Sequence, residues 1–244
     1  MMAGQISVPF EKHADKRETA IVGILALAGA IATATVFTFW PSMDISISSY
    51  FLQPDGSFAL AVSPFWQGVR TVFLRIFIVW YITIAIAGVL AYRLNLPAMR
   101  IDWQRWLYLA ICSIAGPLLL VNVFLKEHWG RWRPREILEL GGHEIFTPVL
   151  QAGGSCARNC SFVSGEVASM VMLFAGLGFA SRHWRPIHFG LALVFGGLVA
   201  FIRIGQGGHF VSDALIGGLA MVLIAAVLHY ALFLNNHSPL RPKV

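Results

Sequence analysis

Charged residues are scarce in this sequence: they make up 12% of its 244 residues, whereas hydrophobic residues make up 57%. A soluble domain usually carries about 25% charged residues, so the composition argues against a soluble protein and favours one that lies in a lipid bilayer. Stretches rich in Gly, Pro or Ser that would separate two domains are also lacking. We therefore expect a single integral membrane domain over residues 1–244.

Cysteine is scarce as well, and three cysteines are too few for a disulfide framework. Cys112 lies within an apolar run and is expected to pack there. Cys156 and Cys160 flank Ala-Arg-Asn in a polar loop, and in an oxidising periplasm they can form a disulfide that stiffens it. Two free or metal-binding thiols are the alternative, but the sequence offers no convincing set of further ligands, and we expect no metal and no other cofactor.

Long hydrophobic runs, in contrast, are abundant. A hydrocarbon core about 30 Å thick needs roughly 20 apolar residues of helix, and six runs meet this requirement. The first run is longer than the apolar core of a signal peptide, so we expect it to be retained. The sequence thus predicts an all-α fold, a six-transmembrane helical bundle. The predicted spans are residues 19–40, 65–92, 105–125, 162–181, 186–205 and 208–234.

Lysine and arginine are distributed unequally among the connecting segments. Residues 41–64 contain none, whereas ten lie before the first span or after the second, fourth and sixth spans. Because cytoplasmic loops carry an excess of Lys and Arg, both termini are expected in the cytoplasm, on the inner side of a bacterial inner membrane. These ten residues are Lys12, Lys16, Arg17, Arg93, Arg100, Arg105, Arg182, Arg185, Arg241 and Lys243.

Eight other cations break this pattern, because they gather near the opposite, periplasmic face. An anionic ligand at that face would explain them, and the net charge of +6 then requires no nucleic-acid partner. The eight are Arg70, Arg75, Lys126, Arg131, Arg133, Arg135, Arg158 and Arg203.

Three short polar blocks lie at the same predicted face. The first is Lys126-Glu-His-Trp-Gly-Arg-Trp-Arg-Pro134, after the third span. The second is Ser161-Phe-Val-Ser-Gly-Glu166, which opens the fourth span, and the third runs from Arg203 to Asp213 between the fifth and sixth spans.

The third block contains a histidine and an aspartate four residues apart. At a helix start, His209 and Asp213 share one face. A carboxylate there can hold one imidazole nitrogen and leave the other free to attack an electrophile. A buried pair that only stabilises the helix is the alternative. Arg203 precedes three glycines, which allow the backbone between them to turn tightly.

The other two blocks offer groups that bind anions. Ser164 and Gly165 stand at a helix N-terminus, where backbone N–H groups and the helix dipole favour phosphate, although an ordinary N-cap by a serine is the alternative. Lys126 and Arg133 can neutralise phosphoryl oxygens. Snorkelling to the membrane interface is the alternative for both cations.

In their order and spacing the blocks resemble the type 2 phosphatidic acid phosphatase family of membrane lipid phosphatases. The pattern of that family is Lys, six residues, Arg-Pro; then Pro-Ser-Gly-His; then Ser-Arg, five residues, His, three residues, Asp. The matching residues are Lys126, Arg133, Pro134, Ser164, Gly165, Arg203, His209 and Asp213. Three positions depart from the pattern: Val163 replaces proline, Ile202 replaces serine and Glu166 replaces the histidine of the second block.

The resemblance implies a two-step displacement in which His209 attacks phosphorus and becomes a phosphohistidine, with Asp213 stabilising the imidazolium. Water then releases phosphate. The phosphoryl oxygens are held by Lys126, Arg133, Arg203, Ser164 and Gly165. In most of the family the histidine of the second block protonates the leaving alkoxide and later activates the water.

Glu166 can fill that role only if it is protonated when needed, and nearby cations favour the carboxylate. We favour a tuned acid and base. Alternatively, His128 or His143 has taken over the role, or the leaving group needs little protonation, as with an anomeric sugar phosphate or a diphosphate. A further alternative is that Glu166 only pairs with a neighbouring arginine.

Arg70 and Arg75 lie outside the blocks, and we expect them to contact a second anionic group of the substrate or to snorkel.

We favour lipid A as the phosphorylated lipid substrate, because of the extra cations and the anomeric leaving group. Undecaprenyl diphosphate and phosphatidylglycerol phosphate are alternatives, as are a lipid phosphotransferase and a non-catalytic lipid-binding protein. The sequence does not give the oligomeric state.

Overall fold

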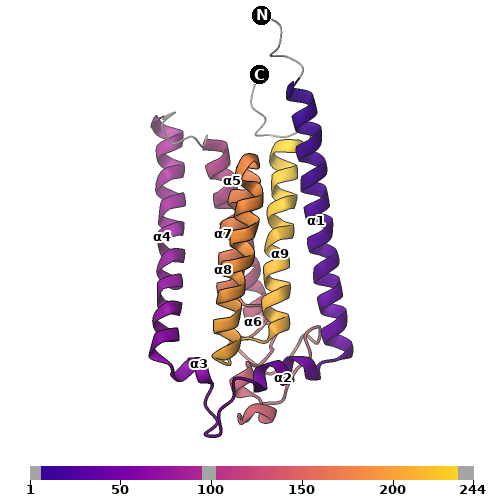
Figure 1. The fold of residues 1–244 in the computed structure, drawn as a ribbon, viewed down its shortest axis with the longest axis vertical. Coiled ribbons are helices and arrows are strands. Elements are labelled where there is room, and N and C mark those ends of the chain that lie inside the picture. The colour runs from indigo at the N-terminus through magenta and orange to yellow at the C-terminus, as the bar shows by residue number, and fades with distance from the viewer. Residues whose placement is uncertain (1–6, 95–102, 236–244) are drawn as a thin grey trace, which may run out of the picture.

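The computed structural model describes residues 7–94 and 103–235, and the regular elements in these ranges are helices. The long helices stand side by side (Figure 1). They are α1 (Ser7–Phe39), α4 (Pro64–Leu94), α5 (Trp103–Ser113) with its continuations η2 (Ile114–Leu125) and α6 (Lys126–His128), α7 (Gly165–Ala180), α8 (Arg185–Gly205), and α9 (Val211–His229) with its continuation η6 (Tyr230–Leu234). The connecting elements are α2 (Ser42–Ser49), α3 (Ala59–Val62), η3 (Pro134–Glu136), η4 (Leu138–Leu140) and η5 (Arg182–Trp184). The expected all-α fold is confirmed.

By length and composition, five helical stretches can cross a membrane. They correspond to the first, second, third, fifth and sixth predicted spans. The stretches are His13–Phe39, Pro64–Leu90, Trp103–His128, Arg182–Gly205 and Val211–Leu234.

The fourth predicted span, residues 162–181, is shorter than expected. Its helix α7 has 16 residues because it begins only at Gly165, after an extended backbone at Ser164. At 1.5 Å per residue it is about 24 Å long, less than the hydrocarbon core. The prediction of six spans is therefore matched by five helices of spanning length and one shorter apolar helix.

Helix α7 lies at the centre of the bundle and packs against α5, η2, α8 and α9. Twelve of its 16 residues are buried. The outer helices instead expose large apolar side chains, such as Ile24 on α1, Ile78 on α4 and Leu193 on α8. Soluble proteins seldom expose so much apolar surface. The chain is a multi-pass membrane protein in which lipid covers the outer helices.

The third span contains a π-helical stretch, η2, with a proline inside it. Pro117 lacks a backbone N–H and cannot continue an ordinary helical ladder. Its carbonyl oxygen accepts a hydrogen bond of 2.7 Å from the Asn122 side chain. This segment carries Asn122 and then Lys126 to the end of the bundle where the three blocks meet.

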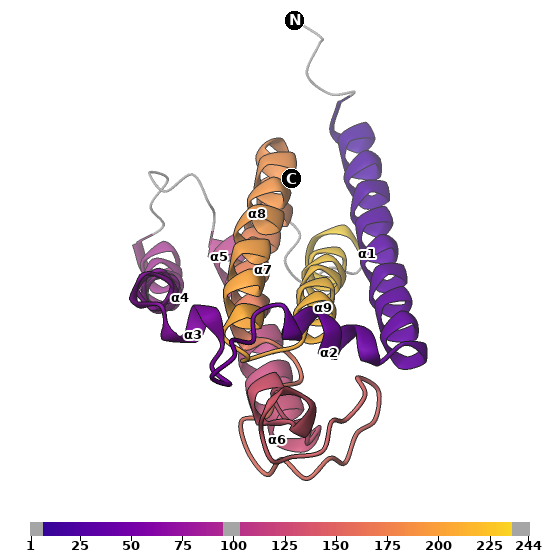
Figure 2. The ribbon, with the colours of Figure 1, turned by 60° about the horizontal axis from the view of Figure 1, so that its bottom comes forward.

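The start of α7, the end of α8 and the start of α9 lie at one end of the bundle (Figure 1), opposite the start of α1. Figure 2 turns this end forward and shows α2, α3 and the segment after α6 lying across it. A small apolar cluster joins these connections to the turn before α9 and includes Phe58, Ile137, Leu140 and Phe210. The connections thus form a cap over the place where the blocks converge.

The opposite end holds a separate group of charges. Arg185 is buried there, and its guanidinium lies 2.6 Å from Asp15 and 3.0 Å from Glu18 of α1. Arg182 lies 3.1 Å from Glu18. Two of the ten cations assigned to the cytoplasmic side therefore lie at the end remote from the blocks. Arg100, Arg241 and Lys243 lie outside the described residues.

Candidate active site

The structure brings the three blocks together around the start of α7. A Cβ atom added to Gly165 would lie 3.1 Å from Lys126 Nζ, so the ammonium group of the first block sits directly against this helix end. Arg203 of the third block reaches the same helix end, since its Nε lies 3.3 Å from Glu166 Oε1. Residues separated by more than 70 positions in the sequence thus form one cationic site.

His209 lies on the turn between α8 and α9 and is almost fully buried, with 2% of its surface exposed. Gly207 makes the turn possible, because its φ is +61° and a side chain there would run into the Phe58 ring. His209 Nδ1 lies 2.6 Å from the Ser161 carbonyl oxygen. A carbonyl oxygen only accepts, so Nδ1 carries the hydrogen, and Nε2 of the neutral ring is left with a free lone pair.

The electrostatic surroundings keep the His209 ring neutral. Burial lowers the pKa of His209 well below its ordinary value of 6.5, and the nearby arginine and lysine cations lower it further. A neutral imidazole with a free Nε2 is the form that can attack phosphorus.

Asp213 does not hold the imidazole directly, contrary to the expectation from the four-residue spacing. Its Oδ2 accepts hydrogen bonds from Phe210 N–H (3.0 Å) and from Ser161 Oγ (2.5 Å). The reason is local, because Asp213 is the third residue of α9 and its carboxylate folds back to cap the start of that helix. Asp213 therefore reaches His209 through Ser161, whose hydroxyl it holds and whose carbonyl orients the ring.

The sequence did not predict that Arg131 pairs with two aspartates; it indicated only that Arg131 is one of the eight cations at this face. It gave no prediction for Asp44. The Arg131 side chain is completely buried, with Nη1 2.5 Å from Asp213 Oδ1 and Nη2 2.8 Å from Asp44 Oδ2. Asp44 also accepts hydrogen bonds from the Ser212 backbone N–H and hydroxyl. The signal available for Asp44 was that it is the one charged residue of the serine-rich segment Ser42–Ser49. These residues fasten α2 to the start of α9.

Glu166 is held by arginines from two other helices. Arg70 of α4 grips both carboxylate oxygens, with Nη2 2.7 Å from Oε1 and Nε 3.1 Å from each oxygen. Arg203 of α8 lies 3.3 Å from Oε1 on the other side. The side chain of Glu166 is 15% exposed. Glu166 is therefore paired with two guanidinium groups.

Two buried polar atoms beside Glu166 have no hydrogen-bond partner within the described residues, namely Ser164 Oγ and Arg203 Nε. Although Arg203 Nε is within ion-pair distance of Glu166, its N–H does not point at that oxygen. Unpaired buried polar groups are rare because each costs about 1–3 kcal/mol. Together with the N–H groups at the start of α7, they suit an anion with several oxygens, such as a phosphoryl group.

Arg133 is positioned by a disulfide loop. The structure joins Cys156 and Cys160 in a disulfide. Within this loop the carbonyl oxygen of Asn159 accepts a hydrogen bond of 2.6 Å from Arg133 Nη2. Cys160 N–H donates to the backbone oxygen of Lys126 at 3.1 Å. The loop therefore contacts two of the cations of the site.

The remaining candidates lie elsewhere. Arg75 faces a groove on the other side of α4, lined by apolar residues such as Ile76 and Leu173. His128 is exposed and its Nδ1 donates to the Phe124 carbonyl, while His143 is an exposed loop residue. In the described ranges neither imidazole forms a hydrogen bond or ion pair with a site residue, and no group of three or more His, Cys, Asp or Glu side chains could hold a metal ion.

A cavity of about 640 Å³ leads from the site between α4, η2 and α7. One part is polar, with Lys126, Glu166 and Asn122. The rest is mainly apolar, with walls that include Leu74, Phe77, Ile78 and Leu118. This shape combines a place for a phosphoryl group with a place for hydrocarbon.

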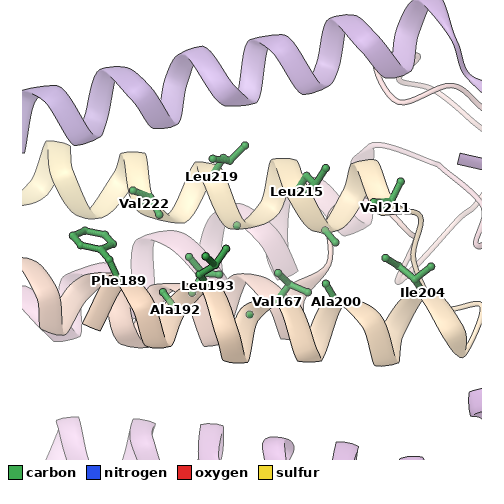
Figure 3. Close-up of a pocket in the computed structure, with 15 residues that line it drawn as sticks. Val167, Phe189, Ala192, Leu193, Ala200, Ile204, Val211, Leu215, Leu219 and Val222 are labelled. Atoms are coloured by element: carbon green, nitrogen blue, oxygen red, sulfur yellow. The ribbon is translucent and has the colours of Figure 1, made fainter. Parts of the chain in front are cut away.

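A second groove, of about 280 Å³, lies between α8 and α9 over α7 (Figure 3). Its lining is entirely apolar and includes Val167, Phe189, Leu193, Ile204 and Leu215. Without a polar group it cannot hold a phosphoryl group, so the cavity that reaches Lys126 and Glu166 is the candidate entrance to the active site.

Comparisons with known proteins agree with this geometry. The model of the PAP2 superfamily matches residues 105–237, which contain all three blocks. A lipid A 4'-phosphatase of Francisella tularensis subsp. novicida (strain U112) is 31% identical over 211 residues, which cover 86% of this chain and 94% of that protein. A lipid A 4'-phosphatase of Rhizobium etli is 33% identical over 210 residues, covering 81% of this chain and 82% of that protein.

One solved structure is also similar. It is the crystal structure of a transmembrane PAP2 type phosphatidylglycerolphosphate phosphatase from Bacillus subtilis. The TM-score is 0.53 at 22% sequence identity, and the match covers 84% of this chain and 93% of that chain. At this identity the likeness concerns the fold alone.

Proposed function

The chain belongs to the PAP2 superfamily and is a membrane lipid phosphatase, a phosphoric monoester hydrolase, and on this premise we propose that it removes the 4'-phosphate of lipid A through a phosphohistidine at His209. The observation that carries the mechanism is the contact between His209 Nδ1 and the Ser161 carbonyl, which leaves Nε2 free. The choice of lipid A is supported by the two similar lipid A 4'-phosphatases, whose matches cover most of this chain.

In the first step, His209 Nε2 attacks phosphorus as the bond to the sugar oxygen breaks. The new imidazolium keeps its hydrogen bond to the Ser161 carbonyl. Lys126, Arg133 and Arg203 hold the phosphoryl oxygens and offset the charge that grows on them. In the second step, water attacks the phosphohistidine and releases phosphate.

The leaving oxygen requires a proton donor. The 4' oxygen is not attached to an anomeric carbon, so the easy leaving group considered from the sequence does not apply to this substrate. Glu166 is the acid that we assign to this step, because it stands at the start of α7, where the family has a histidine, and faces the cavity. Arg70 is then a partner of Glu166 and not the contact for a second anionic group.

We also propose the topology. The short helix α7 completes six spans, the site faces the periplasm, and both termini face the cytoplasm of a bacterial inner membrane. The cation distribution supports this orientation. The apolar walls of the cavity, Leu74, Phe77 and Leu118, would then lie at the depth of the acyl chains.

The test is phosphate release by the purified protein in detergent, with a chelator present. Bis-phosphorylated lipid A, undecaprenyl diphosphate and phosphatidylglycerol phosphate are offered separately, and mass spectrometry locates the phosphate that is lost. We expect loss from the 4' position with the wild type and no loss with His209→Ala. Arg75→Gln, on the far side of α4, is the matched control and should retain activity. Release from either of the other lipids alone would contradict the choice of substrate.

A further inference from the structure

Glu166 is the anion on which the cations of the site converge. Arg70 binds both of its oxygens, and Arg203 lies 3.3 Å away. Lys126 and Arg133 also act electrostatically on it. These four cations come from α4, α8, α6 and the segment after α6. In the described part of the chain, the charged groups that these interactions bring to Glu166 are all cations, so Glu166 is bound there as a carboxylate.

An ionised Glu166 cannot protonate the leaving oxygen, yet the reaction proposed above requires that proton. The two histidines considered as replacements, His128 and His143, are exposed and have no hydrogen bond or ion pair with the site in the described ranges. The site thus contains its acid in the wrong protonation state for the first step.

A bound phosphoryl group can change the protonation state of Glu166. It binds the same guanidinium groups as Glu166 does, and arginine binds phosphate as well as it binds carboxylate. Arg203 Nε already has an N–H that does not point at Glu166. Once the dianion takes the arginines, the carboxylate loses its partners and faces two negative charges in a largely buried position. Both changes favour the neutral carboxylic acid.

We propose that the substrate phosphoryl group displaces Glu166 from Arg70 and Arg203, and that Glu166 takes up one proton from solvent at that moment and so becomes the acid. This inference rests on the proposed phosphatase function. It makes Arg70 a positioning residue that controls the protonation of Glu166.

The protons balance over the cycle. Glu166 gives its proton to the sugar oxygen as the oxygen–phosphorus bond breaks and the bond from His209 Nε2 to phosphorus forms. The carboxylate then takes a proton from the water that attacks the phosphohistidine. When phosphate leaves, Glu166 loses this proton to solvent and pairs with Arg70 and Arg203 again.

The experiment uses inorganic phosphate as the probe and the full-length protein in detergent. Calorimetric titrations at about pH 8, in two buffers with different ionisation enthalpies, count the protons taken up on binding. We expect the wild type to take up about one proton more than Glu166→Gln. As the pH rises, the affinity of the wild type for phosphate should fall about tenfold more per pH unit than that of Glu166→Gln. The variant should also bind phosphate more tightly, because it has no internal anion to displace.

Glu139→Gln is the matched control, since Glu139 is an exposed residue of η4 with no contact to the site in the described residues, and it should behave as the wild type. The Glu166 carboxylate favours the protonated form of Lys126, so any proton uptake at Lys126 on phosphate binding would be larger in Glu166→Gln and cannot produce an excess in the wild type. If Glu166→Gln does not fold, infrared difference spectra of the wild type alone should show a protonated carboxyl band on addition of phosphate.

The proposed displacement of Glu166 would be overturned if phosphate bound with equal proton uptake in the wild type and in Glu166→Gln, or if it bound without the infrared band. Either result would leave the phosphatase proposal unaffected. Failure of the wild type to bind phosphate at all would contradict the cationic site itself and therefore both proposals. If the substrate proved to be a different phosphorylated lipid, the proposed displacement of Glu166 by the phosphoryl group would still hold.

Discussion

The Nδ1 atom of His209 lies 2.6 Å from the carbonyl oxygen of Ser161, and this contact decides which ring nitrogen keeps a free lone pair. The hydroxyl of the same serine donates to Asp213. Ser161 therefore links the carboxylate at the start of α9 to the imidazole, and the orientation of the ring depends on where this backbone segment is held.

Replacing Ser161 by alanine removes the hydroxyl link but keeps the carbonyl. Hydrogen bonds to charged groups contribute about 1.5–3 kcal/mol, so we expect kcat to fall roughly tenfold to a hundredfold while KM changes little. Steady-state kinetics on lipid A check this. Ser155→Ala, which alters an exposed hydroxyl bound to Trp132, is the control and should leave kcat unchanged. A change confined to KM would mean that Ser161 contacts the substrate instead.

The pH dependence follows from His209. In the proposed mechanism its imidazole must be unprotonated to attack, and burial lowers its pKa well below 6.5. Protonation therefore removes the nucleophile only at a pH below that value, and the acid limb of kcat/KM should lie well below pH 6.5. Measurement of kcat/KM from about pH 4 to pH 8 tests this. An acid limb at or above pH 6.5 would contradict a buried, cation-surrounded nucleophile.

The buried group formed by Asp44, Arg131 and Asp213 should matter for stability. Removing one partner of a buried ion pair typically costs about 3–5 kcal/mol, because the remaining charges are left without compensation. Arg131→Met should therefore lower the thermal unfolding temperature markedly. Arg158→Gln removes a cation that is 87% exposed and 3.7 Å from its partner, and should have almost no effect. Equal stability of the two variants would show that the buried group is dispensable.

The disulfide between Cys156 and Cys160 should support activity. It closes the loop that carries Asn159, the partner of Arg133, and it lies next to Ser161. Reductant should lower kcat/KM several-fold in the wild type. The double variant Cys156→Ala, Cys160→Ala should show the lower value with no response to reductant, whereas Cys112→Ala should respond as the wild type does. An unchanged rate in the reduced wild type would remove the disulfide from the account.

The sequence predicted well the features that depend on local patterns. Apolar runs located the five long helices, and the spacing of polar residues located the three blocks. It could not predict which helices supply the partners of those residues. Arg70 and Glu166 are 96 positions apart, and Asp44 and Arg131 are 87 apart. Such pairs depend on how the helices pack, and no local pattern records them.

The errors have local physical reasons. The fourth span was predicted three residues too early because Phe162 and Val163 are apolar, although the backbone before Gly165 is not helical. The spacing of His209 and Asp213 suggested a direct contact because both were placed on one helix. In the structure the helix begins only after His209, and the carboxylate caps its start.

The most direct test of the central claim is a search for the covalent intermediate. Wild-type protein is mixed with lipid A that carries a radioactive 4'-phosphate, quenched within the first turnover in alkali, and digested. We predict label on the peptide that contains His209, stable in alkali and lost in acid, and no label with His209→Ala. Full release of phosphate by the wild type with no labelled protein at any time in the first turnover would contradict nucleophilic catalysis by His209.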